Sequence, residues 1–160
     1  MNTYLLVKWL HIVSSVLLAG TGFGSAFYLF FANRSASLEA RAVVARLVVR
    51  ADLWFTTPAV IVQPLSGLWL AHVAGWSLGT PWLLSSVLLY ALAGACWLPV
   101  LWLQLKMARE VEAALAQRRP LSPQYRRWQQ AWEWLGYPAF TAMLAVFFLM
   151  VNKPQLWSQS

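Results

Sequence analysis

The sequence predicts an all-α integral membrane protein that folds as a four-helix bundle. Apolar residues make up 60% of its 160 residues and charged residues only 11%, against about 25% charged residues in an ordinary soluble domain. Four apolar runs are long enough to cross a bilayer. No alternating pattern typical of a membrane β-barrel is present. Because backbone polar groups in lipid must be satisfied within the segment, these runs are expected to be helices.

The spans are expected at residues 4–31, 53–76, 81–105 and 132–151. Each provides close to or more than the roughly 20 helical residues that about 30 Å of hydrocarbon requires. The first run is too long for the apolar part of a cleaved signal peptide, so we expect it to remain in the membrane. Pro58 and Pro64 in the second run and Pro99 in the third predict kinks.

Two basic connections, residues 32–52 and 106–131, join the first span to the second and the third to the fourth. They hold ten of the twelve lysines and arginines and are rich in good helix formers, so we expect helical extensions there. By the positive-inside rule these connections face the cytoplasm, and both termini lie on the outer, periplasmic side. The expected partner of the arginines is the anionic surface of the lipid bilayer and not nucleic acid.

His11 and His72, the only histidines, are the most informative residues. Ionisable or ligating side chains inside membrane helices are costly and usually functional. In the predicted topology both lie in the outer half of the membrane at similar heights, as two axial ligands of one haem iron would. Trp69, one helical turn before His72, belongs to the same candidate site. The alternative is that each histidine hydrogen-bonds to a neighbouring helix or lies at the interface.

The face of the first helix that carries His11 is polar or small. Lys8, His11, Ser15 and Gly22 recur there at spacings of three, four or seven. Gly22 and the neighbouring glycines leave room for a flat macrocycle, or else they allow close helix packing. Lys8 would pair with haem propionates or extend its ammonium group to water.

Met150, near the outer end of the fourth span, is an alternative axial ligand, since His/Met ligation of haem is common. A methionine packed in the core is the other interpretation. Lys153 is placed like Lys8, within reach of haem propionates or of water. The single cysteine, Cys96, excludes a cysteine-rich metal site.

Glu133 is the acidic residue most expected to be partly buried, at the start of the fourth span. Its expected partner is an inner arginine such as Arg50 or Arg127, in a structural ion pair. No catalytic triad, phosphate loop, HExxH or CxxC motif is present, so hydrolase and kinase chemistry have no support.

Most of the eleven tryptophans fall near the predicted interfaces, as in the aromatic belts of membrane proteins. Only Trp69 and Trp97 lie deeper.

A set of short motifs occurs in order along nearly the whole chain. The motifs are Lys8-Trp9-Leu10-His11-Ile12, Ala19-Gly20, Phe27-Tyr28-Leu29, Thr57-Pro58-Ala59-Val60, Ser66-Gly67-Leu68-Trp69-Leu70, Pro81-Trp82-Leu83, Pro138 and Lys153-Pro154. In this set the chain resembles the HemJ-type membrane protoporphyrinogen oxidases. It is more similar still to a related bacterial family of predicted integral membrane proteins with no assigned function.

The resemblance implies a bacterial inner-membrane protein with several spans, and a b-type haem held by helix histidines, of which the first matches His11. It also implies oxidation of a porphyrinogen. The HemJ-type proteins carry a lysine early in the third helix, where this chain has Ser85 and Ser86. The resemblance therefore supports the bundle and the haem more than the enzymatic activity.

Two functions follow as expectations. The first is a membrane protein that binds haem b through His11 and either His72 or Met150. It would serve in tetrapyrrole or quinone chemistry. Its partner would be a membrane redox protein or, in a homo-oligomer, a second copy of the chain. The second is a non-catalytic structural or accessory subunit of a membrane complex. Whether the chain is an enzyme is left open.

Overall fold

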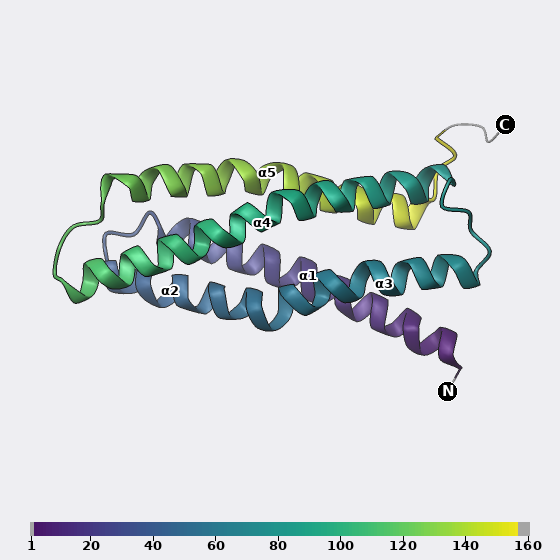
Figure 1. Cartoon of the computed structure of the whole chain (residues 1–160), viewed down its shortest axis with the longest axis horizontal. Coiled ribbons are helices and arrows are strands. Elements are labelled where there is room, and N and C mark those ends of the chain that lie inside the picture. Colours follow the sequence, from purple (N-terminus) through teal and green to yellow (C-terminus); the bar gives the residue numbers. More distant parts are fainter. Residues whose placement is uncertain (1, 157–160) are drawn as a thin grey trace.

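The computed structural model describes residues 2–156 and is a bundle of four long helical rods (Figure 1). The elements in chain order are α1 (Thr3–Ala32), α2 (Leu38–Ala51), the π-helical segment η1 (Asp52–Thr56), α3 (Thr57–Val73), α4 (Pro81–Ala116) and α5 (Pro123–Asn152). Four helices, with α2, η1 and α3 counted as one, are long and apolar enough to cross a membrane. The predicted all-α membrane bundle is confirmed, and no strand occurs within residues 2–156.

The basic connections are mostly helical, as expected. α4 continues from Pro81 to Ala116 instead of ending at residue 105, and α5 begins at Pro123 instead of residue 132. At about 1.5 Å per residue the 36 residues of α4 measure about 54 Å, well beyond the hydrocarbon thickness. The second rod ends at Val73, before Trp76.

Local signals in the sequence account for the helix ends. The side chain of Asn2 accepts a hydrogen bond from the Tyr4 N–H at 3.0 Å, and the Ser37 hydroxyl accepts one from the Ala40 N–H at 3.1 Å. Pro81 and Pro123 begin α4 and α5, where a missing N–H costs nothing. Gly75 follows α3 with φ 74°, a conformation that favours glycine.

Pro58 shapes the junction between α2 and α3. Proline has no N–H, and its ring crowds the carbonyl four residues earlier, so a regular α-helical turn cannot pass through it unchanged. Just before Pro58 the helix forms the wider π-helical turn η1, in which the Thr57 N–H donates a hydrogen bond to the Asp52 carbonyl. The predicted irregularity at Pro58 is therefore a π-helical turn, a feature that often marks functional sites.

The best packed part of the bundle is its basic end. The largest apolar cluster joins α1, α2, α4 and α5 there, through Leu29, Ala42, Ala45, Val48, Leu103, Met107, Val111, Tyr125 and Trp132. Beyond this cluster α1 packs along α3 and α4 along α5. Figure 1 shows these two helix pairs as separate layers.

The start of α1 and the end of α5 lie at the same end of the molecule, opposite the basic turns (Figure 1). This arrangement agrees with an even number of membrane crossings. Which end faces the cytoplasm stays a prediction from the arginines.

Candidate functional site

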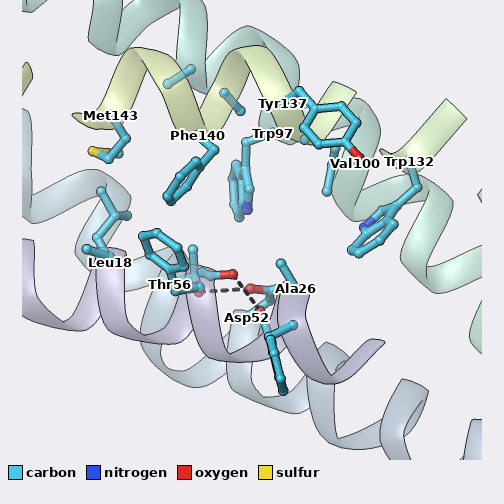
Figure 2. Close-up of a pocket in the computed structure, with 18 of the residues that line it drawn as sticks. Leu18, Ala26, Asp52, Thr56, Trp97, Val100, Trp132, Tyr137, Phe140 and Met143 are labelled. Atoms are coloured by element: carbon cyan, nitrogen blue, oxygen red, sulfur yellow. Dashed lines mark hydrogen bonds between the residues drawn. The ribbon is translucent and has the colours of Figure 1, made fainter. Parts of the chain in front are cut away.

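A cavity of about 520 Å³ lies between the α1/α3 layer and the α4/α5 layer. Along α1 it extends from Leu18 to Phe31, about 20 Å at 1.5 Å per residue. Figure 2 shows Asp52 and Thr56 on one side of the cavity and Trp97 and Phe140 on the other. The walls are mainly aromatic and aliphatic, and the volume lies in the range of about 300–1,000 Å³ that is typical of small-molecule sites.

Three glycines open this cavity from three different helices. Gly22 of α1, Gly94 of α4 and Gly136 of α5 line it, and a Cβ atom added at any of them would meet nothing within 4 Å. Gly20 and Gly24 have the same open surroundings. The glycines of α1 therefore do not mediate close helix packing within the chain.

Three buried polar side chains line the part of the cavity nearest the basic end. Asp52, Gln104 and Trp132 are only 2%, 5% and 6% exposed. Within the described chain, Asp52 Oδ2, Gln104 Oε1 and Trp132 Nε1 have no hydrogen-bond partner. An unpaired buried polar group costs about 1–3 kcal/mol. The three residues with these unpaired atoms border one end of the same cavity, and such groups in a native structure call for an explanation.

Three other polar side chains around the cavity, Thr56, Tyr90 and Glu133, are already paired. Thr56 Oγ1 donates to Asp52 Oδ1 at 2.8 Å, and Tyr90 Oη donates to the Val60 carbonyl at 2.8 Å. The carboxylate of Glu133 accepts two hydrogen bonds from Arg34, at 3.0 and 3.2 Å. The predicted ion pair of Glu133 with an inner arginine therefore exists, but the arginine is Arg34 and not Arg50 or Arg127, because the end of α1 brings Arg34 to it.

His11 lies outside this cavity, in a polar cluster between α1 and α3. Its Nδ1 is 2.9 Å from Ser66 Oγ, and its Nε2 is 3.2 Å from Gln63 Nε2. Ser14 extends the cluster by donating to Gln63 Oε1 and to the His11 carbonyl. Gly67 gives the imidazole its space, because an added Cβ would lie 2.9 Å from His11 Cε1. The interpretation of His11 as a side chain bonded to a neighbouring helix matches this geometry.

The other residues predicted for the haem site do not belong to the hydrogen-bonded cluster of His11. His72 is exposed and lies about 9 Å beyond Ser66 along α3, at 1.5 Å per residue. Trp69 is 36% exposed, and Lys8 is exposed. Gly22 is the member of the predicted set that lines the cavity.

Met150 and Lys153 belong to a small cluster at the end of the molecule where α1 begins. Met150 packs against Ala71, Trp82 and Leu83. The ammonium group of Lys153 is 5.6 and 5.5 Å from the ring centroids of Trp76 and Trp82. These contacts fasten the end of α5 to the turn between α3 and α4.

The residues named for haem have different neighbours in the structure. Both ring nitrogens of His11 are engaged by α3, and His72 and Met150 face other surroundings. Neither histidine lines the cavity, and residues 2–156 contain no cluster of three or more metal-ligating side chains. Haem ligation by His11 with His72 or Met150 stays a prediction.

Sequence reasoning missed the polar end of the cavity. Asp52 follows an arginine-rich segment, which predicts a solvated charge. The positions of Gln104 and Trp132 predict residues of the inner membrane interface. One signal in the sequence could have pointed to Asp52. It directly precedes the apolar run 53–76, and an ionisable residue at the edge of a span is costly and usually functional.

Comparison with known proteins identifies the family of the chain. No curated protein matches it, and no solved structure does. Residues 5–154 match the family described as predicted integral membrane protein (DUF2269). This match covers nearly the whole chain and agrees with the four spans of the structure. The chain belongs to the DUF2269 family of integral membrane proteins.

Proposed function

We propose that this protein binds a lipid-soluble molecule with a flat polar head, of the quinone class, in the cavity between its two helix layers. The observation that carries the proposal is an apolar, aromatic cavity lined at one end by three polar residues that each hold an unpaired buried atom, Asp52, Gln104 and Trp132. Aromatic walls suit a flat ring, and a few convergent polar groups orient it.

A second hollow supports the choice of a ligand with an apolar tail. It has a volume of about 380 Å³ and is formed by α1 and α5. It shares Ala19, Phe23 and Phe147 with the main cavity. The ring of a quinone would occupy the main cavity while its isoprenoid chain passed through this hollow toward lipid.

A matched pair of glycine variants on α1 tests the proposal. Gly22 lines the cavity and Gly24 does not, although both have open space at Cβ. Leucine at Gly22 would fill the cavity, so Gly22→Leu should weaken binding of decylubiquinone at least roughly tenfold, a loss of about 1.4 kcal/mol. Gly24→Leu should bind like the wild type.

Binding is measured by quenching of tryptophan fluorescence as decylubiquinone is added to the purified protein in nanodiscs. Empty nanodiscs correct for partition of the quinone into lipid. Saturable quenching in the wild type and in Gly24→Leu, and its loss in Gly22→Leu, is the expected result. Quenching that does not saturate, or that is equal in all three proteins, would reject the proposal.

Binding of haem b, in a redox or tetrapyrrole role, is the second candidate function. It is supported by the place of His11 inside the membrane bundle, where an ionisable ring is costly and usually has a use. It would require the imidazole to release Ser66 or Gln63 before a ring nitrogen could ligate iron.

A pyridine haemochrome spectrum separates the two candidates. Protein expressed with added haem should show a Soret band if haem b binds, and His11→Ala should remove it. No Soret band in the wild type, and none on titration with haem, would leave quinone binding or an accessory structural role in a membrane complex.

A further inference from the structure

The cavity reaches the surface of the chain along one seam, between α1 and α5. Five large side chains line the cavity and are also 49–60% exposed: Phe23, Phe27 and Phe31 of α1 and Tyr137 and Leu144 of α5. The lining residues of η1, α3 and α4, by contrast, are all buried or half-buried. A side chain that lines a cavity and also reaches the surface lies at the mouth of that cavity. The mouth is therefore between α1 and α5.

The opposite seam, between α3 and α4, is held together. Tyr90 Oη of α4 donates to the Val60 carbonyl of α3 at 2.8 Å. Farther from the basic end, Ala71 of α3 packs against Trp82 and Leu83 of α4. These contacts fasten α3 to α4 on the side where the cavity would otherwise open.

Polar contacts tie α1 to α5 at the basic end of their seam. The carboxylate of Glu133 accepts two hydrogen bonds from Arg34, and Tyr125 Oη donates to Asn33 Oδ1 at 2.6 Å. Arg34 and Asn33 directly follow α1, and their partners lie in the first half of α5. The two helices are thus fixed to each other at this end.

Farther along the seam, α1 and α5 meet through aromatic side chains. Phe23 and Phe140 pack edge to face with their ring centroids 3.9 Å apart, and both rings line the cavity. Such a pair has no directional hydrogen bond to break when one ring rotates. The second hollow lies beside this pair, and its walls are Ser15, Val16, Ala19, Gly20 and Phe23 of α1 and Phe147 of α5.

We infer that the ligand enters the cavity sideways from the hydrocarbon of the bilayer, between α1 and α5, and that Phe23 and Phe140 form the gate. This inference rests on the proposed function and adds the route by which the ligand reaches the site. Residues 23–31 and 137–144 fall within the spans predicted from the sequence, and the five exposed side chains at the mouth carry no charge. The mouth therefore faces hydrocarbon, where an apolar ligand concentrates.

The test measures how fast decylubiquinone enters and leaves the site. Stopped-flow mixing with the protein in nanodiscs follows tryptophan quenching, and the dependence of the observed rate on quinone content gives kon and koff. Empty nanodiscs correct for entry of the quinone into lipid. Phe23→Ala removes half of the gate, so kon should rise about threefold to tenfold. A ring that only touched the bound ligand would change koff and leave kon as it is.

Three further variants assign the effect to the seam. Phe140→Ala removes the other ring and should raise kon by a similar factor. Gly20→Leu adds bulk to the hollow beside the gate, where an added Cβ meets nothing within 4 Å, so kon should fall at least roughly threefold. Phe148→Ala removes an exposed ring of α5 that lines neither the cavity nor the hollow, so kon should stay at the wild-type value.

The outcomes distinguish the gate from the proposed function. Saturable binding with the same kon in the wild type, Phe23→Ala and Gly20→Leu overturns the gate and leaves quinone-class binding intact. Equal acceleration by Phe148→Ala also overturns it, because loss of any exposed ring would then suffice. A change of oligomeric state in Phe23→Ala, measured by mass photometry, overturns it by assigning the seam to a contact between copies. Absence of saturable quenching in the wild type rejects the proposed function itself.

Discussion

Trp132 combines a well-buried ring with an unpaired N–H. The side chain is 6% exposed and is part of the apolar cluster at the basic end. Its Nε1 has no partner within the described part of the chain. The ring therefore stabilises the fold while the N–H destabilises the ligand-free protein, so the two contributions can be separated by substitution.

Trp132→Phe should weaken ligand binding but change the stability of the ligand-free protein little. Phenylalanine retains most of the aromatic packing and removes the N–H, so the Kd for decylubiquinone should rise about threefold to tenfold. The loss of ring volume is offset by removal of an unpaired donor that costs about 1–3 kcal/mol. The Kd is read from the fluorescence titration and stability from thermal unfolding without ligand.

Trp134→Phe is the matched control for this change. Trp134 is 74% exposed and does not line the cavity, so neither the Kd nor the unfolding temperature should change appreciably. Equal effects of the two substitutions on the Kd would show that the N–H of Trp132 does not contact the ligand.

The residues of the candidate site could be predicted only in part from the sequence. Hydropathy places His11 inside a span but does not identify its partners, because these depend on how α1 and α3 align. Glu133 could be placed at an ion pair, yet its partner Arg34 comes from the end of α1, distant in sequence. Asp52 was missed because burial of a carboxyl group next to arginines depends on tertiary packing.

The contact between α1 and α3 depends on one close approach. Gly67 of α3 faces the imidazole of His11, and an added Cβ would lie 2.9 Å from Cε1. Real Cβ atoms do not approach so closely, so the imidazole would have to move and give up its contacts to Ser66 and Gln63.

Gly67→Ala should therefore destabilise the protein. The clash and the lost hydrogen bonds cost about 1–3 kcal/mol, which exceeds the gain of about 1 kcal/mol in helix propensity. Thermal unfolding followed by circular dichroism should show a lower midpoint.

Two further variants show whether the close approach of Gly67 to His11 causes the loss of stability in Gly67→Ala. Gly24→Ala, where the added Cβ meets nothing within 4 Å, should be neutral or stabilising. The double variant Gly67→Ala with His11→Ala should be more stable than the sum of the single effects predicts, because the clash is removed. Additive effects would mean that Gly67 and His11 do not interact.

The four helices could be predicted from the sequence because every membrane span must satisfy its backbone hydrogen bonds in the same way. In lipid each span must satisfy its own backbone, so apolar runs of sufficient length are helices wherever they occur. The extension of α4 to Ala116 follows from helix formers that continue past the apolar run. The exact irregularity at Pro58 could not be predicted, since a proline can be accommodated by a kink or by a π turn such as η1.

The helices are packed closely at the basic end and more loosely farther along. This difference leaves the cavity of the candidate site. The basic end is closed by the cluster that joins α1, α2, α4 and α5. Farther along, the helices pair as α1 with α3 and α4 with α5, and glycines on three of these helices face the space between the pairs. Residues that would fill a bundle core are absent there, so the fold contains a cavity with a polar end instead of a continuous core.

Photoaffinity labelling tests most directly whether this cavity is a quinone-class site. An azido-quinone is bound to the wild-type protein in nanodiscs and photolysed, and the labelled residues are identified by mass spectrometry. If the cavity binds a quinone, labels should appear on cavity residues of both layers, such as Phe30 and Trp97. Excess decylubiquinol should prevent this labelling, and Gly22→Leu should abolish it. Labels confined to lipid-facing residues such as Leu65 and Phe148, unaffected by competitor or by Gly22→Leu, would contradict quinone binding in the cavity.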